Sequence, residues 1–182
     1  MAFYLMQDGG DDETTKFSIC GFPSTHPHFF YPKWFDGKPV DRELQNPLDF
    51  SLNKNHPIFD WVFCSSLKFL ISDKFFNCIK DINWKYEDFP ATIRFKDKFI
   101  SKNHHCINIL SIAHCLAEGS QFDPLGRFLS FDESRLPQYD LSVLEGMPFF
   151  VASERLKTIV EENNISGVKF IKVKYGKPSP KP

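Results

Sequence analysis

Two heptapeptides of this sequence place an apolar run directly before a serine and an acidic residue, in the same order. Phe69–Phe75 reads Phe-Leu-Ile-Ser-Asp-Lys-Phe, and Phe150–Leu156, 81 positions later, reads Phe-Val-Ala-Ser-Glu-Arg-Leu. Each predicts a strand that enters a helix, because the serine hydroxyl can accept a hydrogen bond from an exposed backbone N–H group and the helix dipole favours the acidic residue. The likeness reflects either an internal duplication or chemistry common to such junctions, and the sequence leaves both explanations open.

Apolar residues continue at helical spacing after each serine. The expected buried stripes are Phe75, Ile79 and Ile82 in a helix over 73–83, and Leu156, Ile159 and Val160 in a second helix. The second helix should stop at Asn163, Asn164 and Gly167, which tolerate a left-handed backbone, and a strand over 168–173 should follow. Both junctions are therefore expected to serve the fold rather than catalysis.

Short runs with strand character occur along the rest of the chain, between turn-forming residues. We expect strands over 2–6, 16–22, 48–52, 91–95, 105–109, 128–131 and 148–152, a helix over 112–118 that Gly119 closes, and a polar connection over 132–146. The predicted fold class is α+β, with a mixed, largely antiparallel sheet, a few short amphipathic helices and a candidate duplicated strand-helix-strand unit. Residues 1–175 should form one domain, and the proline-rich residues 176–182 a disordered tail.

Charge and cysteine usage exclude several classes of protein. The net charge is −1, and no block of like charges marks a nucleic-acid-binding surface. No run of apolar residues is long enough to span a membrane, and no secretory signal is recognisable at the N-terminus. The five cysteines are odd in number and widely spaced, which is typical of a reducing compartment. We therefore expect a cytoplasmic protein that binds neither nucleic acid nor membrane.

Histidine and cysteine residues offer the only candidate chemistry, around His104, His105 and Cys106, with His114 and Cys115 downstream. Their spacing does not match the ligand pairs of structural zinc sites, and on a strand His105 would face away from its two neighbours. The cysteines lie among apolar residues, where thiols are usually inert. We expect no catalytic residue, no metal and no cofactor. An uncharacterised hydrolase with a His/Cys-based site remains the alternative, and the role of these residues stays open.

The C-terminal region resembles a bacterial immunity-protein family, the Imm-eleven group, first catalogued as a domain of unknown function. The matching segments are Met147-Pro-Phe-Phe-Val-Ala-Ser-Glu-Arg-Leu-Lys and Val160-Glu-Glu-Asn-Asn-Ile-Ser-Gly-Val-Lys-Phe. Weaker similarities are Trp34-Phe-Asp-Gly, Phe69-Leu-Ile-Ser-Asp-Lys and Cys106-Ile-Asn-Ile-Leu-Ser-Ile-Ala. Their order and spacing agree over about 34–173, and the N-terminal region departs most from the family.

The resemblance implies a protein that binds a cognate toxin of a contact-dependent or polymorphic toxin system and neutralises it stoichiometrically, without catalytic residues. Interface hot spots are typically aromatic or arginine side chains. The partner-binding candidates are therefore Tyr31, Trp34 and Asp36, on or beside a proline-rich loop, although the two aromatic residues are more simply explained as pinning that loop to the core. A homodimer is compatible with the sequence.

Overall fold

The computed structural model describes residues 2–8, 20–21, 36–40, 47–52, 58–63, 69–121 and 128–176. Its strands are β1 (Phe3–Asp8), β2 (Cys20–Gly21), β3 (Leu48–Leu52), β4 (Trp61–Phe63), β5 (Phe69–Ser72), β6 (Tyr86–Phe95), β7 (Lys98–Ile109), β8 (Ile112–Ala113), β9 (Ser130–Phe131), β10 (Leu141–Leu144), β11 (Phe150–Ser153), β12 (Val168–Lys172) and β13 (Lys174–Tyr175). The helices are α1 (Asp73–Ile79), α2 (Glu154–Glu162) and a 3-10 turn, η4 (Glu133–Arg135).

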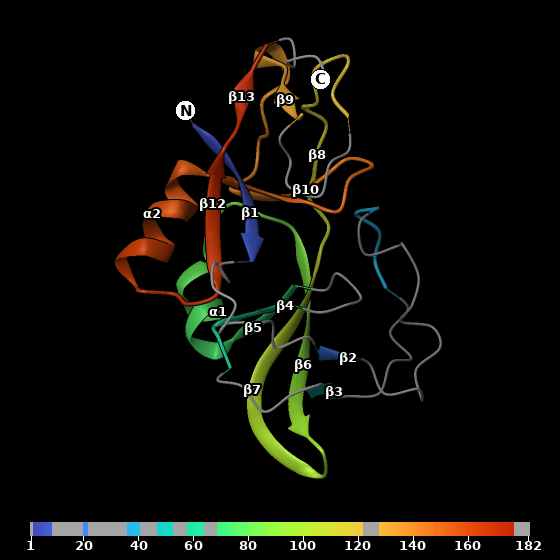
Figure 1. Cartoon of the computed structure of the whole chain (residues 1–182), viewed down its shortest axis with the longest axis vertical. Helices are drawn as coiled ribbons and strands as arrows, with labels where there is room; N and C mark the ends of the chain where they lie inside the picture. Colours follow the sequence, from blue (N-terminus) through green and yellow to red (C-terminus); the bar gives the residue numbers. More distant parts are fainter. Residues whose placement is uncertain are drawn as a thin grey trace.

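Two larger sheets and one short strand pair make up the fold. One sheet has the order β12-β1-β11-β10-β8, the other has the order β2-β3-β6-β7-β5-β4, and β13 pairs with β9. Most strand pairs are antiparallel, with parallel pairing between β3 and β6, β8 and β10, and β9 and β13. The two α-helices lie side by side on one flank of the molecule (Figure 1). The predicted α+β class with a mixed, largely antiparallel sheet is confirmed.

The likeness between the two heptapeptides extends to the elements around them, which form two similar units of five elements each. The first unit comprises β4, β5, α1, β6 and β7, and the second comprises β10, β11, α2, β12 and β1. In both units two antiparallel strands precede the helix and one strand follows it. A further strand, the closing strand, lies between the strand after the helix and the strand before it, and pairs with both. The closing strand of the first unit, β7, follows it in sequence, whereas β1 closes the second from the other end of the chain (Figure 1).

The register of the strands matches between the units residue by residue. Trp61 pairs with Ile71 in the first hairpin, and Leu141 pairs with Ala152 in the second. Ser72 lies opposite His104, and Ser153 lies opposite Phe3. Phe3 is therefore the counterpart of His104, and Tyr4 that of His105. The chemistry of strand-to-helix junctions does not require such matched pairing, so the structure favours an internal duplication.

The core consists of one central cluster and one outer cluster behind each sheet. The central cluster draws on both units: Phe69, Phe75 and Ile107 from the first, and Phe150, Leu156 and Met6 from the second. The outer clusters contain Leu48, Phe50, Leu70 and Ile93 behind one sheet, and Leu5, Phe131, Val151 and Val173 behind the other. Strands such as β5 therefore bury both faces, which explains their continuous apolar runs.

Two expectations about the segment between the units were wrong. The helix over 112–118 is absent, because the buried residues Ser111, Ala113 and Cys115 alternate with more exposed neighbours, which is the period of a strand. The connection expected over 132–146 contains η4 and β10. All four residues of β10 are buried, and this strand lies between β11 and β8 in its sheet. Such a short apolar run carries no periodic signal of its own.

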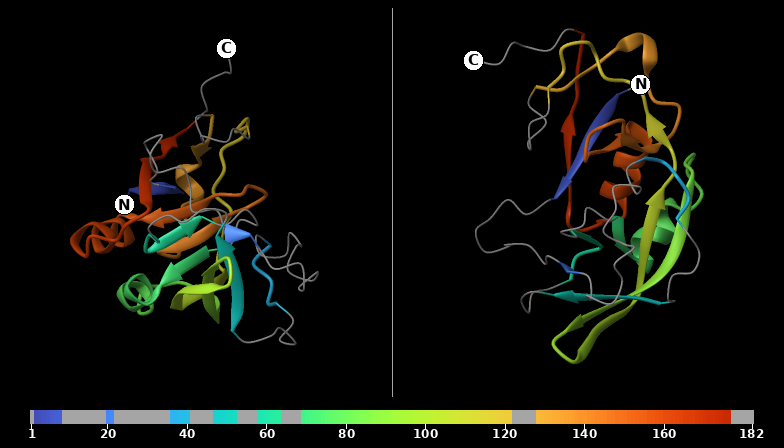
Figure 2. Two further views of the ribbon diagram at one scale, coloured as in Figure 1. Left: turned by 60° about the horizontal axis from the view of Figure 1, so that its bottom comes forward. Right: turned by 90° about the vertical axis from the view of Figure 1, so that its right-hand side faces the viewer.

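The boundaries of the remaining elements were predicted more closely. Helix α1 ends at Ile79 instead of continuing to residue 83, and Ile82 and Trp84 reach the core from the following turn. Strands β6 and β7 are each longer than expected (Figure 2). Of the strand expected over 16–22 only β2 is described, and residues 177–182 of the expected tail lie outside the described part. No helix within that part is long and apolar enough to cross a membrane.

Candidate functional site

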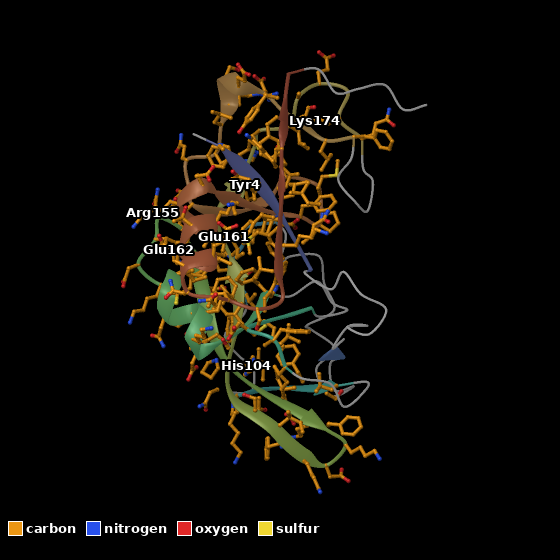
Figure 3. All side chains as sticks on the ribbon, turned by 60° about the vertical axis from the view of Figure 1, so that its left-hand side comes forward. Tyr4, His104, Arg155, Glu161, Glu162 and Lys174 are labelled. Carbon is orange, nitrogen blue, oxygen red and sulfur yellow. The ribbon has the colours of Figure 1, made fainter. Side chains whose placement is uncertain are left out.

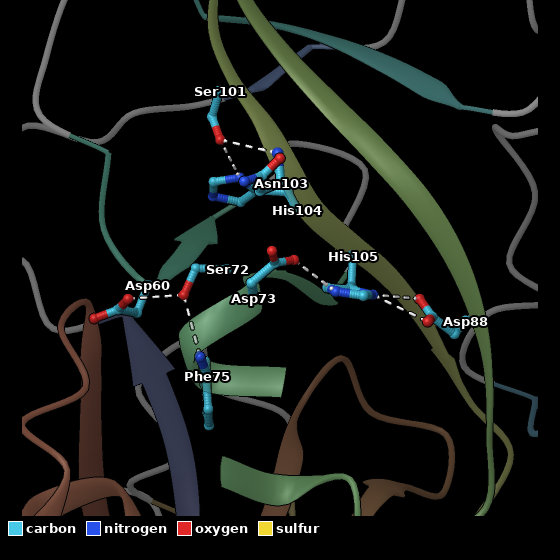
Figure 4. A network of polar contacts seen from close by, with 9 residues as sticks. All are labelled: Asp60, Ser72, Asp73, Phe75, Asp88, Ser101, Asn103, His104 and His105. Atoms are coloured by element: carbon cyan, nitrogen blue, oxygen red, sulfur yellow. Dashed lines mark hydrogen bonds and ion pairs between the residues drawn. The ribbon is translucent and has the colours of Figure 1, made fainter. Parts of the chain in front are cut away.

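His105 lies on β7 between two carboxylates from other elements (Figure 4). Its Nδ1 atom is 2.8 Å from Oδ1 of Asp88 on β6, and its Nε2 atom is 2.9 Å from Oδ1 of Asp73 in the first turn of α1. The ring stacks on Phe76, with centroids 4.1 Å apart. Burial alone would lower the pKa of His105, but the hydrogen bonds and charges of Asp88 and Asp73 outweigh burial and raise it. The two carboxylates thus favour the charged imidazolium, which can donate from both nitrogens.

His104 has the opposite environment on the other face of β7. It is 6% exposed, and its Nδ1 atom lies 2.8 Å from the hydroxyl of Ser101. Its Nε2 atom is buried and has no hydrogen-bond partner among the described residues. Burial lowers the pKa of His104 to about 4, so this ring is neutral at neutral pH. The pKa values of these neighbouring histidines are thus shifted in opposite directions.

Ser72 connects α1 to a third carboxylate in the same network (Figure 4). Its hydroxyl accepts a hydrogen bond from the backbone N–H of Phe75 at 3.2 Å and donates one to Oδ1 of Asp60 at 2.7 Å. Lys74 lies 3.5 Å from the other oxygen of Asp60. Burial alone would raise the pKa of Asp60, but hydrogen bonds from Ser166 and Ser72 outweigh burial and lower it. The Ser72 hydroxyl is thus committed to the helix cap and to Asp60.

The serine, histidine and aspartate side chains gathered around β7 resemble the parts of a hydrolase site, but their geometry does not support nucleophilic catalysis. A general base needs a neutral ring with an accessible lone pair. Both nitrogens of His105 face carboxylates, and the unpaired nitrogen of His104 is buried. The cluster instead joins three strands and a helix through charge-assisted hydrogen bonds.

The second unit contains structural counterparts of several of these contacts. Tyr4, the counterpart of His105, donates a 2.6 Å hydrogen bond to Oε2 of Glu154 in the first turn of α2. This bond raises the pKa of Tyr4 to about 12. Figure 3 shows Tyr4 lying against α2, near Glu161. In both units, therefore, a side chain of the closing strand forms a hydrogen bond to an acidic residue in the first turn of the helix, although the residue types differ.

Asp140 and Ser153 repeat the arrangement of Asp60 and Ser72. The Ser153 hydroxyl accepts from the backbone N–H of Leu156 at 3.2 Å and donates to Oδ1 of Asp140 at 2.6 Å. Arg155 lies 3.4 Å from the second Asp140 oxygen, as Lys74 does from that of Asp60. In both units the serine N–H also donates to the backbone oxygen of the aspartate at 2.8 Å. These polar groups are thus parts of a repeated framework.

The loops after the helices extend this framework across the two units. The backbone N–H of Asn83, after α1, donates to Oδ2 of Asp140 in the second unit. The backbone N–H of Ser166, after α2, donates to Oδ2 of Asp60 in the first unit. Such reciprocal contacts are expected when two similar bodies are related by an approximate twofold axis. The two aspartates therefore hold the units together as well as capping their helices.

The remaining histidine and cysteine candidates are not gathered into one site. His114 is exposed and its Nδ1 atom lies 2.8 Å from Oε2 of Glu145. Cys115 is buried, and burial raises the pKa of its thiol to about 12, so its thiolate is not populated at neutral pH. Within the described ranges no three His, Cys, Asp or Glu side chains converge as metal ligands.

Of the predicted partner-binding residues, Asp36 alone lies in the described part of the chain; Tyr31 and Trp34 lie outside it. Asp36 is exposed in a turn with Gly37, whose φ of 61° suits glycine. A Cβ atom on Gly37 would lie 2.6 Å from Ile112 and 2.8 Å from the carbonyl oxygen of Leu110. The turn thus packs closely on the chain around β8. This close approach and the positive φ explain why a glycine is needed at position 37.

An open hollow of about 600 Å³ lies beside this turn. Leu110 and Ile112 belong to its lining, together with Lys85, His114, Arg135 and Tyr139. The cationic groups are partly engaged: Arg135 pairs with Asp132 at 2.9 Å, and Lys85 lies over the Tyr139 ring. Gly37, next to Asp36 in the turn, therefore packs against two residues that line this hollow, whose volume is enough for a side chain or loop of a partner.

The hairpin of β6 and β7 was not among the predicted functional surfaces. Phe99 and Ile100 on this hairpin are 44% and 42% exposed, and they are the large hydrophobic side chains that remain exposed in the described ranges. A signal was present, since 95–102 reads Phe-Lys-Asp-Lys-Phe-Ile-Ser-Lys, with an apolar pair between lysines. The turn Lys96-Asp97 lacks the Asn-Gly or Asp-Gly pair by which hairpins are usually recognised, yet Lys96 adopts a φ of 52°.

Comparison with known proteins assigns no family to the chain. No protein-family model matches the sequence, and no curated protein is significantly similar to it.

Proposed function

We propose that this chain is a cytoplasmic immunity protein that binds and neutralises a cognate bacterial toxin by a stoichiometric protein–protein interaction. The sequence resemblance to the Imm-eleven group supplies the class of partner. The observation that carries the proposal is that the most enzyme-like cluster, around His104 and His105, has a counterpart built from Phe3 and Tyr4 in the second unit. Phenylalanine and tyrosine fill these positions without an imidazole, so the histidines are explained by the fold.

Binding without catalysis requires only a stable scaffold and an accessible surface. The two packed units supply the scaffold, and two surfaces of the described chain are available: the hollow beside Asp36 and the end of the β6–β7 hairpin. A neutraliser of this kind acts by covering the toxin's active site or by holding the toxin in an unproductive conformation. One molecule of immunity protein should therefore inactivate one molecule of toxin.

Co-expression with the product of the reading frame directly upstream of the gene tests this proposal. We expect a 1:1 complex on size-exclusion chromatography with light scattering, and growth of cells that the upstream product alone would kill. Failure of any complex to form would refute the proposal. A toxin inactivated at substoichiometric amounts of this protein would do the same, since only an enzyme turns over.

The double variant H104F/H105Y separates binding from the hydrolase alternative. It transplants Phe3 and Tyr4 onto the equivalent positions of β7, so the fold should survive while both imidazoles are lost. We expect protection against the toxin to be retained within about twofold, with an unchanged circular dichroism spectrum. Loss of protection by a folded variant would instead indicate an enzyme that uses these histidines.

A further inference from the structure

The end of the β6–β7 hairpin projects beyond the two packed units. Counterparts in the second unit reach as far as Ile93 on β6, since Lys174 and Tyr175 of β13 pair in parallel with β9 as Thr92 and Ile93 pair with β3. On β7 they reach as far as His104, which matches Phe3. Residues 94–103 lie beyond this shared framework, and in Figure 1 they form one extremity of the molecule. The packing of the duplicated core therefore does not account for this extension, or for the apolar side chains on it.

Phe99 is held in a defined position although it is exposed. The guanidinium carbon of Arg94 lies 3.8 Å from the centroid of its ring, and the ammonium of Lys102 lies 4.5 Å away. Arg94 is itself fixed by Asp49 on β3, whose carboxylate is 2.7 Å from its Nε atom. Thr92 donates a 2.7 Å hydrogen bond to the other Asp49 oxygen. Such restraint lowers the conformational entropy that binding would cost.

Ile100, the residue after Phe99, lies at an irregularity in the pairing of β6 and β7. Arg94 pairs with Phe99, but Ile93 pairs with Ser101, so Ile100 is the extra residue of a β-bulge. Bulges bend a strand and re-aim a side chain away from regular alternation. The bulge thus leaves Ile100, which follows the restrained Phe99 in sequence, without a partner in the ladder.

The surroundings of this apolar pair are strongly basic. Arg94, Lys96, Lys98 and Lys102 carry positive charge, whereas Asp97 is the acidic residue in the same stretch. The whole chain has a net charge of −1, so the basic tip contrasts with the molecule as a whole. An apolar centre inside a charged rim is the usual composition of a protein-binding surface.

We propose that the end of the β6–β7 hairpin, residues 94–102, is the toxin-binding surface, and that it inserts Phe99 and Ile100 into an apolar pocket rimmed by carboxylates on the toxin. This inference rests on the proposed function. A protein partner fits better than a nucleic acid, because Ile100 offers no face for base stacking and the basic residues form a compact tip rather than a groove that follows a phosphate backbone.

Titration of tip variants against the co-purifying upstream product tests the assignment. We expect F99A/I100A to weaken binding about thirty-fold or more, as removal of hot-spot anchors does. K98E should weaken it less, mainly through slower association at low salt, because rim charges steer encounter. Neither variant should lower the midpoint of thermal unfolding by more than a few degrees, since these side chains fill no core.

K80E is the matched control for charge, because Lys80 is exposed at the end of α1, away from the hairpin. It should bind like the wild type. A complex that forms equally well with F99A/I100A would overturn the tip assignment and leave the proposed function standing. Absence of any complex with the wild-type protein would overturn both. Tip-dependent binding of a labelled single-stranded 20-mer oligonucleotide, without tip-dependent toxin binding, would replace the protein partner by a nucleic acid.

Discussion

At the scale of single residues, His104 makes the free energy of unfolding depend on pH. Burial lowers its folded pKa to about 4, below an unfolded value of about 6.5. The unfolded chain therefore binds the proton first, and stability is lost as the pH falls from about 6.5 through 4, by an amount on the order of 3 kcal/mol. H104F should remove this loss. Urea unfolding of both proteins at pH 7 and pH 5 measures the difference.

His105 provides the control with the opposite sign. Asp88 and Asp73 raise its folded pKa, so its stabilisation is complete below about pH 6.5 and is lost as the pH rises through the higher folded value. H105Q should reduce the loss of unfolding free energy at higher pH and leave the dependence of unfolding free energy on pH below about 6.5 unchanged. An unchanged acid-side slope in H104F would show that His104 is solvated or protonated in the folded protein.

At the scale of elements, the helix starts depend on more than a cap. Ser153 is buried, and its hydroxyl serves both the N–H of Leu156 and the carboxylate of Asp140. S153A removes the cap and leaves Oδ1 of the mostly buried Asp140 carboxylate without its serine donor, so it should cost roughly 2 to 3 kcal/mol. Ser134 makes similar local bonds at the exposed turn η4. S134A should therefore cost no more than about 0.5 kcal/mol in the same urea titration.

At the scale of the whole molecule, β1 is the closing strand of a unit whose other elements lie at the far end of the chain. A circular permutant that joins Gly176 to Ala2 through a linker of about six Gly and Ser residues, with new termini between Asp8 and Cys20, would make that unit continuous. The ends are near one another, since the Phe3 N–H donates to the Tyr175 hydroxyl at 3.1 Å. We expect unfolding free energy within about 1 kcal/mol of the wild type.

The permutant should also fold faster, because β12 and β1 become a local hairpin and the long loop between them no longer has to close. Stopped-flow refolding measures the rate. A chain without residues 1–8 is the control: it should fail to fold cooperatively, since β11 and β12 lose the strand between them. Cooperative folding of that shortened chain would show that the second unit does not need its distant strand.

The sequence by itself determined the features that depend on neighbouring residues. Ser72 and Ser153 cap their helices as predicted, and Leu48, Phe50 and Leu52 bury one face of β3. Both follow from spacing along the chain, because caps and amphipathic faces involve residues only a few positions apart.

Only the tertiary structure decided the features that depend on distant partners. It brings Asp73 and Asp88 to His105, sets Phe3 opposite Ser153, and turns 112–113 and 141–144 into sheet strands. It also leaves Phe99 exposed on an extension that the shared framework does not cover. The physical reason is that strand pairing and burial are settled between segments up to about 170 residues apart, where no local pattern records which partner a residue will meet.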